Sequence, residues 1–370
     1  MSSTTEKDVL VLQGGGALGS YQAGAFEALF ASGRRTDWVA GVSIGAINAA
    51  LIAGNLPERR TERLRAFWDL VSSDTAALPF LAGLIPRGFY NELSASAAMA
   101  QGVPGFFAPR FPPAALMPVG TAGASSFYDT APLRDTLTDL VDFDYLNAGS
   151  IRLCTGAVNV ETGNMTWFDS ARQTITPEHI LASGALPPGF PAVEIDGQFY
   201  WDGGLVSNTP LQYVFDERPD EDLCIFQVDL FNARGKMPTS IWDIEARTKD
   251  IRFSSRTRLN TDMLCDMHVT RRAGKRLYGK LPPALRDDPD ALALLSNGCD
   301  PKITIAHLIY RQTRFERQSK DYEFSRTSMR EHWQAGGRDV ATTLNHPDWH
   351  ARHNDTSHVR VFDLTKIQTR

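Results

Sequence analysis

A serine flanked by glycines is the first candidate for chemistry, in the string Gly41-Val42-Ser43-Ile44-Gly45. When a GxSxG string joins a strand to a helix, it forms a sharp turn that presents the serine hydroxyl above the sheet edge. Gly41 and Gly45 suit such a turn because larger side chains would collide there. The helix that begins after Ser43 also directs the positive end of its dipole at the hydroxyl. The motif therefore predicts Ser43 as a nucleophile.

A glycine-rich string, GGGALG, covers residues 14–19 at an earlier strand–helix junction. Unpaired backbone N–H groups at the start of a helix form a concavity that binds anions. An acyl-transfer enzyme needs such donors to stabilise the tetrahedral oxyanion. We expect the N–H groups of Gly15 and Gly16 to supply them.

The same string matches the GxGxxG pattern of dinucleotide-binding proteins, which is the competing function for it. That function needs an acidic residue at the end of the second strand to hold the ribose. The end of this strand carries Gly41-Val42-Ser43, and Asp37 lies at its beginning. Dinucleotide binding is therefore disfavoured.

A carboxylate on a tight turn is the third candidate, in Trp201-Asp202-Gly203-Gly204. On its own, an Asp before two glycines indicates only a turn. The functional alternative is a carboxylate presented on a tight loop, where Gly203 and Gly204 let another part of the chain approach. Asp202 could then accept the proton of Ser43 directly. Because an Asp in water has a pKa of about 3.9 and is a weak base, such a site must exclude water.

A triad that contains a histidine is the competing arrangement. An α/β-hydrolase orders its triad as Ser, then Asp or Glu, then a C-terminal His, and usually places the serine after several strands. Here the serine follows only two predicted strands, and no histidine lies in a motif-like turn, so a histidine base is disfavoured. The eight histidines are His179, His268, His307, His332, His346, His350, His353 and His358.

The elements expected around these motifs alternate between strands and helices, which indicates a layered α/β fold. Short apolar runs that end in glycine or polar residues predict strands, and longer runs with one apolar face predict helices. The expected strands cover 8–12, 38–42, 151–160, 164–168 and 223–230, with a short hairpin at 194–200, and the expected helices cover 17–32 and 43–53.

The segment 78–118 is apolar and rich in Pro, Gly and Phe. We expect it to be too interrupted for a regular helix. Two arrangements remain open for it: an ordered loop packed on the body, or an apolar flap beside the site that contacts lipid.

The last third of the chain is basic and mainly helical in its pattern. Residues 241–370 carry 23 Lys and Arg against 17 Asp and Glu, whereas residues 1–240 carry 15 against 26. The basic part could face an anionic membrane, pack on the acidic part, or be solvated. We expect one or two Arg-rich helices at 243–277, a strand at 302–310 that returns to the sheet, and a helix at 312–334 with an apolar stripe of Phe315, Tyr322, Met329 and Trp333.

Composition excludes several other classes of protein. The net charge of −5 gives no general attraction to nucleic acid. The four cysteines show no CxxC spacing and no histidine cluster, which fits reduced thiols and indicates no metal site. The N-terminus lacks the pattern of a signal peptide, and no run approaches the roughly 18 apolar residues of a membrane span. We expect a cytoplasmic protein without metal or cofactor, in contact with the inner face of the membrane at most peripherally.

The three motifs QGGGALG, GVSIG and DGG together resemble the bacterial patatin-like phospholipase family, in order and spacing, over residues 8–215. The resemblance implies a three-layer α/β/α sandwich around a mostly parallel sheet. It also implies that residues 14–16 (Gly14, Gly15 and Gly16) form the oxyanion hole, that Ser43 is the nucleophile, and that Asp202 is its sole partner.

Leu18 departs from the family pattern, because many members carry Arg or Lys at this position. The backbone donors do not depend on that side chain, so we expect an effect on local charge or head-group preference only. The segments SGALPPGFPAVEIDGQFYWDGG and KDYEFSRTSMREHW also resemble a subgroup with an additional C-terminal domain. This implies a catalytic domain at 1–235 and a mainly helical extension at 236–370.

The function implied is hydrolysis of a lipid acyl ester, as by a phospholipase A or an acylglycerol lipase, through an acyl-Ser43 intermediate. Two alternatives remain open: an acyltransferase that passes the same acyl group to another lipid, and a lipid-binding protein without activity. The intact Gly15, Ser43 and Asp202 argue against the second. Head group, acyl-chain length and oligomeric state stay open.

Overall fold

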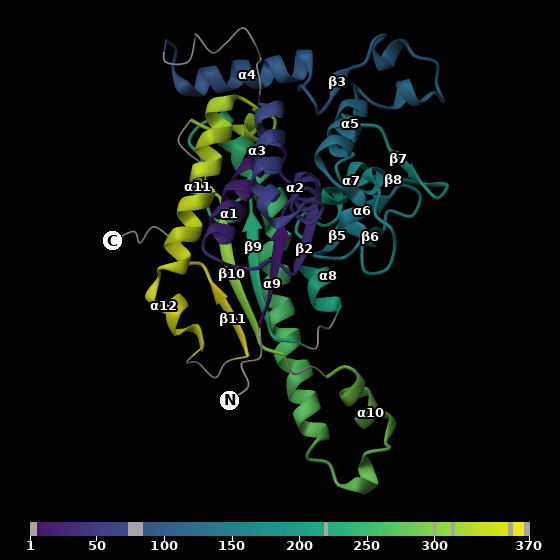
Figure 1. The fold of residues 1–370 in the computed structure, drawn as a ribbon, viewed down its shortest axis with the longest axis vertical. Coiled ribbons are helices and arrows are strands. Elements are labelled where there is room, and N and C mark those ends of the chain that lie inside the picture. The colour runs from purple at the N-terminus through teal and green to yellow at the C-terminus, as the bar shows by residue number, and fades with distance from the viewer. Residues whose placement is uncertain are drawn as a thin grey trace.

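The computed structural model describes residues 6–72, 84–217, 221–298, 301–311, 315–353 and 358–365. Figure 1 shows a central sheet with helices on both faces. The strands are β1 Lys7–Leu12, β2 Trp38–Val42, β3 Ala108–Pro109, β4 Tyr128–Asp129, β5 Arg152–Asn159, β6 Met165–Asp169, β7 Val193–Ile195, β8 Gln198–Asp202, β9 Leu223–Asp229, β10 Ile303–Ile309 and β11 Val359–Phe362. The helices are α1 Ser20–Ala31, α2 Ile44–Ala53, α3 Arg60–Val71, α4 Arg87–Gln101, α5 Ala131–Leu140, α6 Phe143–Asn147, α7 Pro177–Ser183, α8 Leu211–Asp216, α9 Ile241–Tyr278, α10 Pro289–Ser296, α11 Arg326–Leu344 and α12 Pro347–His350.

The main sheet is mostly parallel. In the described part of the chain its strands follow the order β11-β10-β9-β1-β2-β5-β8-β7, and β6 also pairs with β5. Every neighbouring pair from β11 to β5 is parallel. β6 and β8 run antiparallel to β5, and β7 runs antiparallel to β8. The carboxyl ends of β1 and β2 therefore meet at one edge, which is where the glycine-rich loop and the serine follow them.

The two faces of the sheet are covered by different helices. Leu10 and Leu12 of β1 belong to the core cluster that includes side chains of α1, α2 and α11. Val9 and Val11, which alternate with them, pack with side chains of α8 and α9 on the other face. These layers confirm the expected α/β/α sandwich (Figure 1).

Most of the expected elements are confirmed. The hairpin at 151–168 is the antiparallel pair β5 and β6, and the long Arg-rich helix is α9. The strand expected at 302–310 is β10, which pairs in parallel with β9. A further strand that the sequence did not indicate, β11, pairs with β10 at the edge of the sheet.

The prediction that segment 78–118 cannot hold a regular helix is wrong. Its residues 78–83 lie outside the described ranges, but α4 occupies residues 87–101. Pro86 stands at the N-cap and Gly102 follows the last turn, so the residues that suggested interruption flank the helix. Between them Ala, Leu, Glu and Met favour the helix. Phe106 and Phe107 further on are buried in the core.

The predicted helical stripe in 312–334 is only half right. Met329 and Trp333 lie on α11, but Phe315 and Tyr322 precede it. The helix starts later because Ser325 caps it and accepts a hydrogen bond from the N–H of Ser328. A short 3₁₀ helix, η8, occupies Gln318–Asp321 instead.

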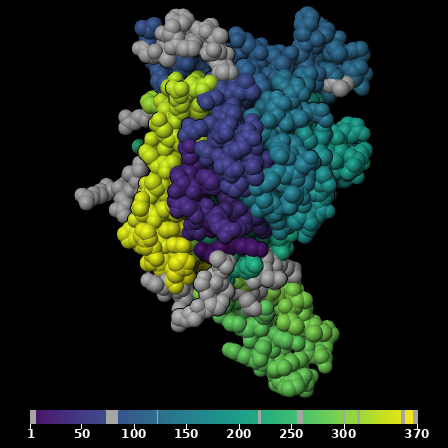
Figure 2. Space-filling view, in the orientation of Figure 1, coloured from purple at the N-terminus to yellow at the C-terminus, as the bar shows by residue number. Residues whose placement is uncertain are grey.

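The helix α9 extends well beyond the sheet. Its C-terminal half and α10 form an arm that projects from the body (Figures 1 and 2). No helix in the described part of the chain is long and apolar enough to span a bilayer.

Candidate active site

Ser43 occupies the strained turn between β2 and α2. Its φ of 56° lies in the left-handed region that non-glycine residues rarely adopt. A Cβ at Gly41 would lie 2.3 Å from the carbonyl O of Gly45, and one at Gly45 would lie 2.3 Å from that of Leu12. Gly41 is therefore required for the turn to close on itself, and Gly45 is required for it to pack against β1.

Ser183 holds this turn in place, and the sequence did not indicate it. The N–H of Ser43 donates to Ser183 Oγ at 3.0 Å. That hydroxyl in turn donates to the carbonyl O of Gly156 at 2.7 Å. The fully buried Ser183 thus links the turn to β5. A serine at the end of an apolar helix was the only sequence signal for it.

The register of the sheet brings Asp202 to the same edge as Ser43. Val42, the last residue of β2, pairs with Gly156 of β5. The next residue of β5, Ala157, pairs with Asp202 at the end of β8. Only β5 lies between Ser43 and Asp202, and the residue of β5 that pairs with Val42 is a glycine, Gly156.

The side chain of Asp202 is almost completely buried, with 3% of its surface exposed. Burial raises the pKa of Asp202 from 3.8 to about 6, although hydrogen bonds with Ser43 and with the N–H of Gly204 oppose the increase. Gly204 donates to Asp202 Oδ1 at 2.7 Å. Gly203 packs closely on β5, where a Cβ would lie 2.4 Å from the carbonyl O of Gly156. The carboxylate is thus a stronger base than an Asp in water.

The three glycines of the first motif differ in what their N–H groups do. The N–H of Gly14 donates to the carbonyl O of Asn208 at 3.1 Å. No such backbone hydrogen bond within the described ranges engages the N–H of Gly15 or Gly16. Both of these glycines line the cavity that contains Ser43. The N–H of Gly14 therefore already has a hydrogen-bond partner, whereas the N–H groups of Gly15 and Gly16 make no such backbone bond where these two residues line the cavity.

Two side-chain amides, of the buried Gln13 and the half-buried Asn208, hold the glycine-rich loop, and the sequence indicated neither role. Gln13 Oε1 accepts hydrogen bonds from the N–H groups of Leu230, at 2.6 Å, and Phe231, at 3.0 Å. Asn208 Nδ2 donates to the carbonyl O of Gly14 at 3.0 Å. The loop is thereby joined to β9 and to the segment after Asp202. For Gln13, the sequence signal was a polar residue directly after the apolar strand β1.

The 3₁₀ helix η8 lies over the glycine-rich loop. A Cβ at Gly16 would lie 2.0 Å from the carbonyl O of Asp321 in η8, and Gly16 has a positive φ of 54°. Lys249 of α9 forms an ion pair with Asp321 at 2.6 Å. Lys320 and Asp250 form a second, buried pair at 2.5 Å between the same two elements. These contacts fix η8 over the loop.

The functional groups share one apolar cavity of 360 Å³. Its wall combines Ile47 of α2 with aromatic side chains from several distant segments, and no histidine in the described part of the chain lines it. Leu18 does not line it either, because that side chain is fully buried in the core. The aromatic lining residues are Phe106, Phe107, Phe127, Tyr128, Phe190, Phe231, Phe253, Tyr322 and Phe324. A cavity of this kind accommodates a long apolar chain and excludes water from the carboxylate.

One group of potential metal ligands lies elsewhere in the described residues. Glu6, Asp8 and Cys224 could share an ion, but they lie at the start of β1 and β9, at the opposite end of the strands from Ser43. Arg34 already forms an ion pair with Asp8 at 2.7 Å. At the Ser43 end of the strands, the structure brings together a hydroxyl, a buried carboxylate and the N–H groups of Gly15 and Gly16, a set of groups that would suit acyl transfer.

Comparison with protein families gives two matches. Residues 10–215 match the model described as "Patatin-like phospholipase", and residues 251–356 match one described as "Patatin phospholipase". No curated protein sequence is significantly similar to the chain.

Two solved structures are also similar to the chain at low identity. VipD from Legionella pneumophila has 13% identity and a TM-score of 0.35, and the match covers 90% of this chain and 67% of that one. The type III effector protein ExoU has 14% identity and a TM-score of 0.27, and the match covers 90% of this chain and 53% of ExoU. Similarity at this level does not bear on function.

Proposed function

The chain belongs to the patatin-like phospholipase family, and from this premise we propose that it cleaves lipid esters with a Ser43–Asp202 dyad through an acyl-enzyme. Membership of the family makes it a lipid ester hydrolase. The observation that carries the dyad is a buried carboxylate, hydrogen-bonded to the serine in an apolar cavity, with a pKa raised to about 6.

In the proposed first step, Ser43 Oγ attacks the ester carbonyl carbon while its proton passes to Asp202. The oxyanion accepts hydrogen bonds from the N–H groups of Gly15 and Gly16, each expected to contribute about 10²-fold to the rate. As the tetrahedral intermediate collapses, the bond to the alcohol oxygen breaks, and Asp202 returns the proton to that oxygen. Asp202 then takes a proton from water, whose oxygen attacks the carbonyl carbon of acyl-Ser43. As this second tetrahedral intermediate collapses, the bond to Ser43 Oγ breaks, Asp202 returns the proton to that oxygen, and the fatty acid leaves.

A fluorophosphonate probe tests the nucleophile directly. We expect the probe to form a covalent adduct on Ser43 and on no other serine, because Ser43 is the one serine among the described residues that line the cavity with the buried Asp202 and with Gly15 and Gly16. Peptide mass spectrometry identifies the adduct, and ester hydrolysis should fall in proportion to labelling. Folded protein that hydrolyses lipid esters at full rate after labelling elsewhere would contradict the proposal.

We further propose that residues 1–235 form the catalytic domain and that residues 236–370 form an extension which completes its cavity. Phe253 of α9 and Tyr322 and Phe324 beyond η8 line the cavity. The extension also continues the sheet through β10. Substrate binding is therefore proposed to involve both parts of the chain.

We also propose that the protein contacts membranes peripherally, through an apolar rim formed by Met99, Phe111, Leu116, Val119 and Phe127. Phe111 is 96% exposed and Val119 is fully exposed. Met99 and Phe127 belong both to this rim and to the lining of the cavity. A surface with this much exposed apolar area that continues into a lipid-sized cavity fits a bilayer interface.

Replacing Phe111 and Val119 together with Ser is expected to weaken binding to lipid vesicles by about tenfold, because the apolar side chains no longer leave water on binding. Sedimentation with phosphatidylglycerol vesicles measures the effect. The matched control replaces two other exposed leucines with Ser, Leu285 at the end of the 3₁₀ helix Pro283–Leu285 and Leu292 on α10, and is expected to bind as the wild type does. Equal loss in both variants would contradict the assignment of the rim.

A further inference from the structure

A buried ion pair joins Lys320 of η8 to Asp250 of α9 and has no part in the mechanism proposed above. Lys320 is 3% exposed and Asp250 is 7% exposed, and Lys320 Nζ donates to Asp250 Oδ1 at 2.5 Å. Burying two charges costs about as much free energy as their attraction returns, so such a pair adds little to stability. It does restrict η8 and α9 to the one relative position in which both charges are paired.

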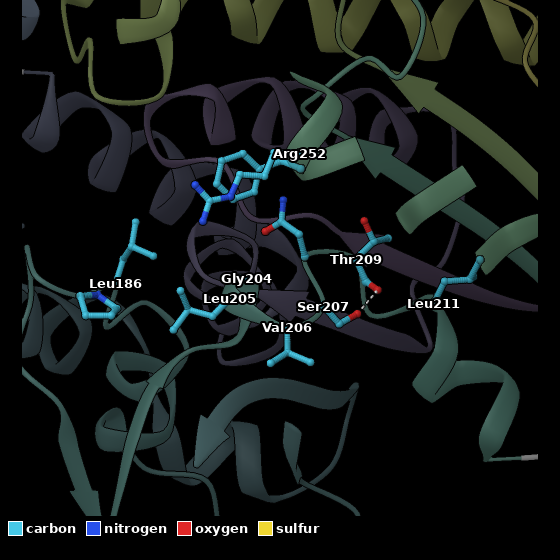
Figure 3. Close-up of a pocket in the computed structure, with 11 residues that line it drawn as sticks. Leu186, Gly204, Leu205, Val206, Ser207, Thr209, Leu211 and Arg252 are labelled. Atoms are coloured by element: carbon cyan, nitrogen blue, oxygen red, sulfur yellow. Dashed lines mark hydrogen bonds between the residues drawn. The ribbon is translucent and has the colours of Figure 1, made fainter. Parts of the chain in front are cut away.

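Close packing alone does not place α9 beside the site. A cavity of 420 Å³ is lined by Arg252 and Phe253 of α9 and by residues 204–209, which follow the buried carboxylate. Figure 3 shows Arg252 on the opposite side of this cavity from Val206. Side chains that face each other across a cavity lose their mutual contacts. On this side, the position of α9 therefore depends on its polar contacts elsewhere.

Lys320 supports both of the surfaces against which Gly15 and Gly16 pack. The next residue, Asp321, has its carbonyl O so near Gly16 that a Cβ there would lie 2.0 Å from it. On the other side, Lys320 Nζ lies 5.4 Å from the centre of the Phe231 ring. A Cβ at Gly15 would lie 3.2 Å from Cε2 of that ring. A shift of this one lysine would therefore reach both glycines.

Gly15 and Gly16 depend on such outside support for the direction of their N–H groups. Neither N–H makes a backbone hydrogen bond within the described ranges. Glycine also has no side chain to limit its backbone angles, so consecutive glycines do not hold a conformation by themselves. Donors stabilise an oxyanion only when they already point at the position where the negative charge develops. Contacts from outside the loop can therefore set the rate of the chemical step.

The helix α9 reaches the same loop through two further contacts. Gln13, directly before the glycines, donates from Nε2 to the carbonyl O of Phe253 at 3.2 Å. Lys249 Nζ donates to Asp321 Oδ1 at 2.6 Å. The loop is thus held from both of its ends by elements of the C-terminal extension.

We propose that Lys320 is a positioning residue for the reaction. Paired with Asp250, it holds η8 against the glycine-rich loop, so that the N–H groups of Gly15 and Gly16 point at the oxyanion. This inference rests on the proposed acyl-enzyme mechanism, because that mechanism supplies the oxyanion. It gives the C-terminal extension a part in the chemical step, in addition to its part in lining the cavity.

The test replaces both charges with apolar side chains of similar size, in the double variant Lys320→Met and Asp250→Leu. Changing Lys320 alone leaves a buried, unpaired carboxylate and can prevent folding, whereas an apolar pair is expected to keep the stability of the wild type in urea. With a soluble short-chain ester, kcat should fall at least about tenfold while KM changes less than about twofold, because displaced donors weaken binding of the oxyanion and not of the ester. A folded double variant with the wild-type kcat would overturn the proposal.

The matched control removes another partly buried ion pair from the same extension. Arg311 Nη2 lies 2.8 Å from Asp363 Oδ1, and neither residue lines the cavity that contains Ser43. The variant Arg311→Met and Asp363→Leu should keep the wild-type kcat and KM. An equal loss of kcat in this control would show a general effect of disturbing the extension and would count against a specific role for Lys320.

A trifluoromethyl ketone gives a readout without turnover. Ser43 Oγ adds to its carbonyl carbon, the hydroxyl proton passes to Asp202, and the tetrahedral adduct carries an oxyanion. Its affinity is expected to fall about tenfold in the Lys320→Met and Asp250→Leu protein. An ether of the same length, which has no carbonyl to attack, should bind as it does to the wild type. Equal losses for both inhibitors would mean that η8 shapes the cavity and does not direct the donors, which contradicts the proposal.

Failure of this inference can be distinguished from failure of the dyad. Wild-type protein that hydrolyses the ester and forms the adduct on Ser43, with an unchanged kcat in the Lys320→Met and Asp250→Leu protein, refutes the role of Lys320 alone. Wild-type protein with no adduct on Ser43 and no hydrolysis refutes the dyad and, with it, this inference.

Discussion

Replacing Ser43 with Ala is expected to reduce ester hydrolysis at least about 10⁴-fold, because Ser43 is the one serine among the described residues that line the cavity with Asp202, Gly15 and Gly16. The loss should appear in kcat, since the apolar cavity that binds the acyl chain is unchanged. Fatty-acid release from a soluble ester measures it. A variant that keeps near-normal turnover would exclude Ser43 as the nucleophile.

Ser43→Gly provides the matched control for folding. The backbone at this position has a φ of 56°, which costs a non-glycine residue on the order of 1 kcal/mol or more. The glycine variant should therefore be as inactive as the alanine variant but more stable by about 1 kcal/mol. Urea denaturation compares the two. This result would show that the turn stores strain in order to expose the hydroxyl.

Replacing Asp202 with Asn is expected to lower kcat/KM about 10³-fold, because the amide cannot accept the proton of Ser43. In the wild type, kcat/KM should fall as the pH decreases through about 6, where the carboxylate becomes protonated. The residual activity of the variant should show no such inflection. A wild-type profile without an inflection between pH 5 and pH 7 would contradict Asp202 as the base.

The same substitution should raise stability at neutral pH. The folded-state pKa of Asp202, about 6, lies above the ordinary value of 3.8, so the folded protein binds the proton more tightly than the unfolded chain. Its contribution to stability is fully present below the ordinary pKa and is lost as the pH rises through about 6. A shift of this size corresponds to at most about 3 kcal/mol.

The free energy of unfolding at pH 7.5 and at acidic pH, compared between wild type and Asp202→Asn, measures this contribution. We expect the variant to be the more stable protein at pH 7.5 and the difference to shrink on acidification. A variant that is less stable at pH 7.5 would mean that the hydrogen bonds from Ser43 and Gly204 outweigh the burial of the charge. Gain in stability together with loss of activity is the behaviour expected of a base held in an apolar site.

Much of this architecture could be predicted from local sequence. The strand before each motif is a short apolar run, and the turn after it carries glycines where a side chain would collide with backbone. Close approaches of this kind, such as the Gly45 position 2.3 Å from the Leu12 carbonyl, admit no other residue. Gly41, Ser43, Gly45 and Asp202 were therefore recognisable as a set. The difference between Gly14 and the two glycines that follow it could not be predicted, because the N–H of Gly14 donates to the carbonyl O of Asn208, which is distant in the sequence.

Sequence alone thus determined the strands and turns that carry the three motifs, together with their chemical groups, because each depends on residues close to one another in the chain. Tertiary structure alone decided how they act together. The pairing of β2 with β5 and of β5 with β8 sets Asp202 beside Ser43, and enclosure by α4, α9 and η8 removes the water that would keep its pKa low. Register and burial arise from contacts between distant segments, so no local pattern specifies them.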